Sequence, residues 1–130
     1  MKEFMLLIRN EPDGKAAFTS DHEQKFLNSC RTYIENLKRN GNLISAQPLV
    51  REGKVISGTT GAFTDKPYST AGEMIVGYYH IRAADINEAV AIAKNNPEFS
   101  FVKDARIEVR PIKTAEVSTS YVYPGGTETQ

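Results

Sequence analysis

Hydrophobic positions in the first third of the chain change from a continuous run to a helical stripe. Residues Glu3 to Arg9 form a short apolar run that is typical of a buried strand and ends at turn-forming residues. From Ser20 onward apolar residues recur at helical spacing, and Glu23 occupies the capping-box position. The stripe consists of Phe26, Cys30, Tyr33, Ile34 and Leu37. Asn40 and Gly41 end this helix, which should run for roughly 20 residues, or about 30 Å.

The centre of the chain predicts an edge strand, a small hairpin and a long loop. Residues 43–50 form a weaker strand, and Pro48, which has no backbone N–H to donate, places it at a sheet edge. A turn at residues 52–53 leads into residues 54–57, which should pair with the edge strand as a hairpin. Residues 58–72 are rich in Gly, Thr and Ser and have no period, so we expect a loop of a length that is usually functional or mobile.

A strand, a helix and a second strand follow over residues 74–112. Apolar and aromatic residues dominate residues 74–82, which is typical of a strand covered on both faces. Asp85 can cap a helix that Glu88 closes as the capping-box partner, and the helix should end at Pro97. The residues at helical spacing on one face are Ile86, Ala89, Val90 and Ala93.

The last strand has one apolar and one charged face. Ile107 and Val109 alternate with charged residues, namely Arg106, Glu108 and Arg110. Beyond it, residues 118–123 are strand-like and are followed by Pro124 and glycines. We therefore expect a domain at residues 1–113 and an extension at residues 114–130 that frays or exchanges with another copy.

The order of elements predicts an α+β fold of the ferredoxin-like βαββαβ type, with helices on one face of an antiparallel sheet. Alternation along the strands places a mixed set of residues on the other face: Met5, Leu7, Arg9, Val76, Tyr78, His80, Arg82, Glu108 and Arg110. This face is too apolar to remain in water and too charged for an ordinary core. The pattern predicts a homodimer in which two such sheets pack face to face, with ion pairs offsetting the cost of burying charge.

Composition narrows the classes of function. The chain has 130 residues, 40% hydrophobic and 25% charged, which is ordinary for one soluble domain. Because 16 basic residues balance 16 acidic ones, the charge favours neither nucleic acid nor acidic lipid. A single cysteine excludes an internal disulfide and suits a reducing compartment. No run of roughly 20 apolar residues and no signal-peptide pattern occurs, so we expect a cytoplasmic protein without membrane contact.

His80 is the best polar candidate for chemistry. Its imidazole, among Tyr78, Arg82 and Glu108, could act as a general base near neutral pH with the carboxylate orienting it. The alternative is a hydrogen-bonded histidine at the dimer interface.

Two further pairs of charged residues have a functional and a structural interpretation. Arg9 and Arg110 could clamp a carboxylate or phenolate ligand, or could instead pair with Glu108 across the sheet. Asp65 and Lys66 could belong to a lid that closes over the pocket, with Asp65 taking part in catalysis, or could lie in a solvated turn.

The remaining reactive residues favour structural roles. His22 lies in the first turn of a helix, where a histidine is usually exposed, and Cys30 lies on the apolar stripe without a base beside it. The sequence contains no phosphate-binding loop, dinucleotide fingerprint, HExxH or GxSxG motif, and two histidines with one cysteine make a zinc site improbable. We therefore predict no cofactor and no metal.

The segments KEFMLLIR, REGKVISGTTGAFTDKPYSTAGEMIVGYYHIRAADINEAVAIAKNNP and ARIEVRPI together resemble the YCII-related proteins, in particular the branch with a DGPF motif. The resemblance covers about residues 2–113, and its most specific parts are the Gly-Tyr-Tyr strand with the capped helix after it and the ending Glu108 to Pro111. Residues 60–63 align with the DGPF motif, and they have Thr60 in place of its Asp and Ala62 in place of its Pro. The resemblance implies a ferredoxin-like fold that dimerises as an α+β barrel, and implies little chemistry.

Some relatives are associated with lyase or dehydrochlorinase-like chemistry that uses a His and Asp pair. The position of that histidine falls near Cys30 in this chain, and His22 lies instead at the helix start. The resemblance therefore carries no catalytic pair over to these residues.

Two hypotheses from different classes remain. The first is a binding or regulatory homodimer that holds an anionic or aromatic ligand between its sheets through Arg9, His80 and Arg110. The second is a cofactor-independent lyase or isomerase with His80 as the proton shuttle. The sequence favours the first because the histidine of the relatives is missing.

Overall fold

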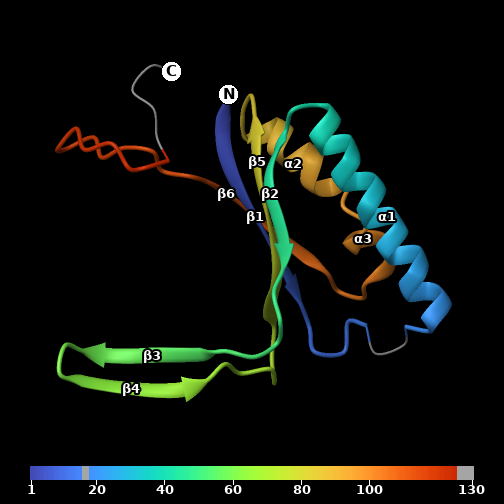
Figure 1. Cartoon of the computed structure of the whole chain (residues 1–130), viewed down its shortest axis with the longest axis horizontal. Coiled ribbons are helices and arrows are strands. Elements are labelled where there is room, and N and C mark those ends of the chain that lie inside the picture. The colour runs from blue at the N-terminus through green and yellow to red at the C-terminus, as the bar shows by residue number, and fades with distance from the viewer. Residues whose placement is uncertain (16–17, 126–130) are drawn as a thin grey trace.

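Four strands form one antiparallel sheet that carries three helices on one of its faces (Figure 1). The structure, a computed structural model, describes residues 1–15 and 18–125. Its strands are β1 (Lys2–Asn10), β2 (Leu43–Pro48), β3 (Lys54–Thr59), β4 (Ala62–Pro67), β5 (Met74–Ala83) and β6 (Arg106–Pro111). Its helices are α1 (Ser20–Arg39), α2 (Ile86–Lys94) and α3 (Glu98–Phe101).

The order of strands in the sheet is β2-β5-β1-β6, and each neighbouring pair is antiparallel. This order confirms the predicted ferredoxin-like α+β fold. Strand β2 lies at an edge, as Pro48 requires, because a proline at a central position would break the ladder on one side.

The core lies between the sheet and the helices. Phe4, Leu6 and Ile8 alternate along β1 and are at most 3% exposed, because every second residue of this strand faces the helices. Tyr33 of α1 donates its hydroxyl to the carbonyl of Ile92 at 2.7 Å and so satisfies its polar atom inside the apolar layer. The other buried members of this cluster are Leu37, Tyr79, Ile81, Ala83, Ala89 and Ala93.

The N-cap of helix α1 is Thr19, one residue before the predicted cap Ser20. The hydroxyl of Thr19, rather than that of Ser20, accepts a hydrogen bond from the backbone N–H of His22 at 3.1 Å. Either hydroxyl can cap a helix, so composition alone did not distinguish them. At the other end Gly41 has φ +76, which confirms the predicted left-handed stop.

Helix α2 confirms its predicted start. The carboxylate of Asp85 accepts a hydrogen bond from the N–H of Glu88 at 2.9 Å, and the Glu88 carboxylate accepts one from the N–H of Ala84 at 2.8 Å. Ile86, which we predicted on the buried face, is 42% exposed because it stands at the first helical position, where the end of the helix borders a cleft.

The prediction of a hairpin between residues 43–50 and 54–57, followed by a loop at residues 58–72, is wrong. Strand β3 pairs instead with β4, and the two form a separate two-stranded ribbon. The cause is local: Gly61 has φ +85 in the two-residue connection, and the threonines and Phe63 around it favour strands despite the loop-like composition. This ribbon extends from the end of the sheet away from the helices (Figure 1).

The prediction that Val76 shares the face of Tyr78 is also wrong. The pairing of β1 with β5 shifts register between Ile8 and Arg9, so that Arg9 lies opposite Ile75. The irregularity takes Val76 out of the alternation, and its side chain packs against the core. Ile75, which we did not predict on this face, is 41% exposed.

The predicted strand at residues 118–123 does not form. An isolated bridge joins Ala115 to Val122, and residues 117–119 make a turn between them. The hydroxyl of Tyr123 donates to the carboxylate of Glu116, which raises the pKa of that tyrosine. The end of the predicted extension, residues 126–130, lies outside the described residues. Among the helices of the described residues, none is long and apolar enough to cross a membrane.

Candidate functional site

The face of the sheet opposite the helices gathers the predicted functional residues from three adjacent strands. Met5 of β1 lies opposite His80 of β5 on one side and Arg110 of β6 on the other. The residues that share this alternation, which we call the open face, are Glu3, Met5, Leu7, Arg9, Tyr78, His80, Arg82, Arg106, Glu108 and Arg110. Within one chain the sheet is therefore covered on one face, and β5, which we expected to be covered on both, is not.

The carboxylate that pairs with His80 is Glu3 and not the expected Glu108. The Nε2 atom of His80 lies 2.7 Å from Oε1 of Glu3, and each side chain is about a quarter exposed. Glu3 stands on the neighbouring strand β1, diagonal to His80, whereas Glu108 stands on β6, beyond β1. The signal was in the sequence, because Glu3 precedes Met5 by two residues and so shares its face.

The neighbours of His80 on β5 differ in their partners. The hydroxyl of Tyr78 lies 3.3 Å from Oγ of Ser45, a half-buried contact across the edge strand β2. Arg82 is exposed, and within residues 1–15 and 18–125 no ion pair reaches its guanidinium. Glu3 is the residue opposite Arg82, but its carboxylate contacts His80. Arg82 therefore lies beside the pair of His80 and Glu3 with the N–H donors of its guanidinium available.

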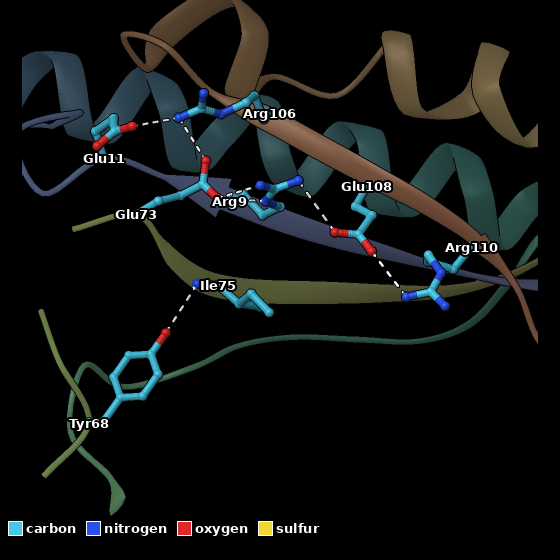
Figure 2. A network of polar contacts seen from close by, with 8 residues as sticks. All are labelled: Arg9, Glu11, Tyr68, Glu73, Ile75, Arg106, Glu108 and Arg110. Atoms are coloured by element: carbon cyan, nitrogen blue, oxygen red, sulfur yellow. Dashed lines mark hydrogen bonds and ion pairs between the residues drawn. The ribbon is translucent and has the colours of Figure 1, made fainter. Parts of the chain in front are cut away.

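A network of ion pairs covers the other end of the open face (Figure 2). Arg9 contacts Glu73 through Nη2 at 2.5 Å and Nε at 2.8 Å, and Glu108 through Nη1 at 3.4 Å. Glu108 also holds Arg110 at 3.2 Å. Of the two interpretations of these arginines, the structure shows the pairing with Glu108, which reaches Arg9 across the sheet and Arg110 along β6.

The network continues through residues that the sequence did not single out. Arg106 reaches Glu73 at 2.7 Å and Glu11 at 2.5 Å, so Glu73 bridges two arginines from neighbouring strands. Glu73 precedes β5 and Glu11 follows β1, and loop positions such as these carry no alternation that would assign them to a face. Arg9 is therefore occupied by two carboxylates, whereas Arg110 has one partner and a side chain that is 66% exposed.

A comparison with models of protein families matches the YCII-related domain over residues 2–116. The chain belongs to the YCII-related family. The match includes all six strands and three helices, and with them the complete open face. A comparison with the curated proteins finds no match.

Asp65 and Lys66 of this YCII-related domain lie on the β3–β4 ribbon and not in a loop over the site. Asp65 pairs with Ile56 and Lys66 with Val55, and all four residues are exposed. The ribbon extends away from the body, so within one chain Asp65 is not brought to His80 (Figure 1).

Among the residues that the structure describes, two clefts beside the sheet concern this site. One, of about 730 Å³, lies where β1 begins and β5 ends, and both Glu3 and Arg82 line it together with residues of the segment after β6. The other, of about 650 Å³, lies between α1 and β2 and is lined by Cys30 among others. Of these two clefts, the first includes Glu3, the partner of His80, in its lining.

Cys30, Tyr79 and His22 of the YCII-related domain are each partly or fully buried. Burial, with a smaller effect of the Glu98 carboxylate, raises the pKa of the Cys30 thiol to about 11, which disfavours the thiolate. Burial likewise raises the pKa of Tyr79 to about 12. His22 was expected to be exposed but is half-buried, because its ring packs between Phe18 and Phe101 at 4.6 and 5.1 Å.

The described residues contain no group of three or more histidine, cysteine or acidic side chains with the geometry to hold a metal ion. The open face itself offers an imidazole, carboxylates, a phenol and guanidinium groups. Such a set can bind an anion and can move a proton.

Proposed function

We propose that this YCII-related domain is a cytoplasmic, small-molecule-binding homodimer, in which two open faces pack together as a dimeric α+β barrel. A polar pocket between the sheets would hold a small anionic or aromatic ligand. The observation that carries this proposal is the position of Arg82, which has no ion pair among the described residues, beside the hydrogen-bonded pair of His80 and Glu3.

The mixture of side chains on the open face supports association. Met5 and Leu7 are half-buried there although no helix or strand within residues 1–15 and 18–125 covers them, and Ile75 is 41% exposed. Burying this apolar surface favours a partner with the same face. The charges of Arg9, Glu73 and Glu108 are already matched within one chain, which lowers the cost of removing them from water.

The available donors support an anionic ligand. A guanidinium presents two parallel N–H groups to a carboxylate, and Arg82 is free to do so. Arg110 offers a second, partly occupied guanidinium level with His80, and the ring of Tyr78, on the other side of His80 from Arg82, offers an aromatic surface on the same face. Together these groups suit a small aromatic carboxylate or phenolate more than a neutral sugar or a cation.

Binding can be tested with benzoate as the probe. Isothermal titration of the wild-type dimer should detect benzoate, and Arg82→Gln should weaken its binding about tenfold or more, since the paired charge-assisted hydrogen bonds are lost. Arg39→Gln is a matched control, because Arg39 is an exposed arginine at the end of α1 whose partner is Asn36. Equal affinities of wild type and Arg82→Gln for benzoate would remove Arg82 from the site.

The pair of His80 and Glu3 favours a second candidate, a cofactor-independent lyase or isomerase. A carboxylate 2.7 Å from Nε2 fixes the orientation and tautomer of the ring, and leaves Nδ1 to exchange a proton with a substrate. Such a base would exchange a proton next to a carbonyl or carboxyl group. Solvent deuterium should then enter 2-oxo acids or lactones in the presence of the wild-type protein.

The two candidates differ in what His80→Ala changes. Both expect a folded protein, since His80 is partly exposed on the open face. Only the enzyme would lose deuterium exchange while benzoate affinity, held by Arg82, is retained. Exchange that proceeds equally in wild type and His80→Ala would exclude His80 as the acid or base.

A further inference from the structure

The β3–β4 ribbon stands apart from the rest of the molecule. All residues of both strands are exposed, and three of them carry large apolar side chains: Val55, Ile56 and Phe63 are 51%, 65% and 62% exposed. An isolated two-stranded ribbon is marginally stable in water, because it orders many residues and buries little apolar surface. This ribbon therefore requires a surface that the single chain does not provide.

The two faces of the ribbon are not equivalent. Ile56 lies opposite Asp65, and the next pair on the same face is Gly58 with Phe63. Ile56 and Phe63 are therefore diagonal neighbours. Gly58, opposite Phe63, has no side chain to cover the aromatic ring, so the ring is open to a partner. The other face carries Val55 among threonines, Ser57 and Lys66. The face of Ile56 and Phe63 is the one that needs a cover.

The shape of the ribbon is built into its own sequence. A Cβ atom at Gly58 would lie 2.2 Å from the carbonyl oxygen of Ala62, and the residue has φ +111. No other residue type fits there without moving the backbone. Together with Gly61 at the turn, this position makes the ribbon a defined structure and not a loop that happens to be extended.

Hydrogen bonds hold the base of the ribbon against the sheet, so the direction in which the ribbon points is a property of the fold. The hydroxyl of Tyr68 accepts a hydrogen bond from the backbone N–H of Ile75 at 3.3 Å (Figure 2), and the N–H of Tyr68 donates to the carbonyl of Gly53 at 2.9 Å. From this base the ribbon extends on the side of the open face, opposite to the helices (Figure 1).

The length of the ribbon determines what it can reach. A six-residue strand spans about 20 Å, whereas two stacked sheets are about 10 Å apart. A ribbon that leaves one sheet on its open side therefore passes the sheet of any copy stacked on that face and runs along its flank. The apolar residues of the open face, such as Met5 and Leu7, and the Ile56 and Phe63 face of the ribbon would then be covered by one and the same partner.

We infer that the β3–β4 ribbon is a clasp, which packs its Ile56 and Phe63 face against the flank of a second copy of this chain. The inference rests on the proposed dimer through the open face. It adds that each copy contributes a residue to the rim of the other's pocket. That residue is Asp65, which stands halfway along the ribbon on the same face as Ile56. Its carboxylate would lie at the rim of the partner's pocket.

The first test is photo-cross-linking of the full chain. p-Benzoylphenylalanine replaces Phe63 or, as the control on the opposite face, Val55, and isotopically heavy and light copies are mixed before irradiation. The clasp predicts heavy-to-light cross-links from position 63, with a yield about tenfold above that from position 55, because a benzophenone reacts only with groups it touches. Sedimentation equilibrium of the same samples reports the oligomeric state.

The outcomes separate the clasp from the dimer. A dimer by sedimentation without heavy-to-light cross-links from position 63 overturns the clasp and leaves the proposed dimer standing. A monomer at every concentration overturns both. Cross-links from position 63 to an unrelated protein in cell extract, and none between copies of the purified dimer, would also overturn the clasp, since its occupant would then be another protein.

A second test does not depend on a reactive residue. The double change Ile56→Asp with Phe63→Asp should raise the dissociation constant of the dimer by about tenfold or more, because each carboxylate would be buried without a partner. Val55→Asp places a charge on the other face and should leave the constant within about twofold. Equal effects of the two variants would overturn the choice of face and with it the clasp.

Discussion

The two faces of the four-stranded sheet are made from the same strands but are completed in different ways. Leu6 and Leu7 are adjacent in β1, yet Leu6 is 0% exposed beneath the helices and Leu7 is only half-buried on the open face. The helix side is closed by elements of its own chain. The open side is held by polar contacts between strands, such as the one between His80 and Glu3.

This difference separates two kinds of organisation. Burial of apolar groups is not directional, so the helix side needs only that apolar residues occur at the right period. Ion pairs and hydrogen bonds depend on which side chains lie opposite each other, so the open side depends on register. Substitutions on the helix side and on the open side should therefore lower the free energy of unfolding by different amounts.

The largest effect is expected from truncating the two adjacent leucines. Leu6→Ala should lower the free energy of unfolding by about 3 kcal/mol, because it leaves a cavity in a packed layer. Leu7→Ala should lower it by about 1 kcal/mol or less in the isolated chain. Urea denaturation of both variants measures the difference.

Protein concentration provides the control for this pair. The effect of Leu6→Ala should be independent of concentration, whereas that of Leu7→Ala should grow with concentration if two open faces associate. Equal and concentration-independent losses for both leucines would mean that the two faces are equally closed within a single chain.

Alkylation of Cys30 tests the helix side by its chemistry. Burial raises the pKa of this thiol from an ordinary value of 9.0 to about 11, so the native state disfavours the thiolate. Only the thiolate reacts, and at pH 9 an ordinary thiol is about half ionised but Cys30 only about 1%. Iodoacetamide should therefore label the native protein about fiftyfold more slowly than the urea-unfolded chain.

The pH profile distinguishes this cause from simple blocked access. If the raised pKa is responsible, the labelling rate of the native protein should continue to increase up to about pH 11, whereas that of the unfolded chain levels off above about pH 9. A native rate that is slow but levels off at the same pH as the unfolded chain would assign the protection to steric cover.

The helix side of the molecule was predictable from the sequence because its signals are local. Apolar periodicity gave β1, α1 and β5, and Asp85 with Glu88 gave the start of α2. The ribbon was missed because Gly61 and the threonines near it suit a loop and a strand equally in composition, and only the pairing decides.

For the open side, the sequence predicted most of the residues that lie on it but not which of their side chains pair. Alternation placed His80, Arg82 and Glu108 on one face, as observed. It failed for Val76, because a register shift is a property of the pairing of two strands and leaves no mark on either alone. It also did not distinguish Glu3 from Glu108 as the partner of His80, since that choice depends on which strand lies beside β5.

The smallest expected effect comes from removing one guanidinium of the open face. Arg9→Met keeps the apolar part of the side chain but leaves Glu73 and Glu108 without their shared partner. The free energy of unfolding should fall by only about 1 kcal/mol, because each of the two partly buried carboxylates loses one guanidinium but keeps another, Arg106 for Glu73 and Arg110 for Glu108. Urea denaturation at low and high salt measures this loss, which should shrink as salt screens the two carboxylates.

Lys25→Met is the matched control for this last substitution. Lys25 pairs with Asp21 at 3.3 Å on α1, but both side chains are more than two-thirds exposed. Such a pair is worth little, so the change should stay within about 0.5 kcal/mol at either salt concentration. Equal losses for Arg9→Met and Lys25→Met would mean that the ion pairs of the open face behave as ordinary surface pairs. These ion pairs would then not lower the cost of bringing two open faces together, whereas the apolar contribution of Met5 and Leu7 would remain.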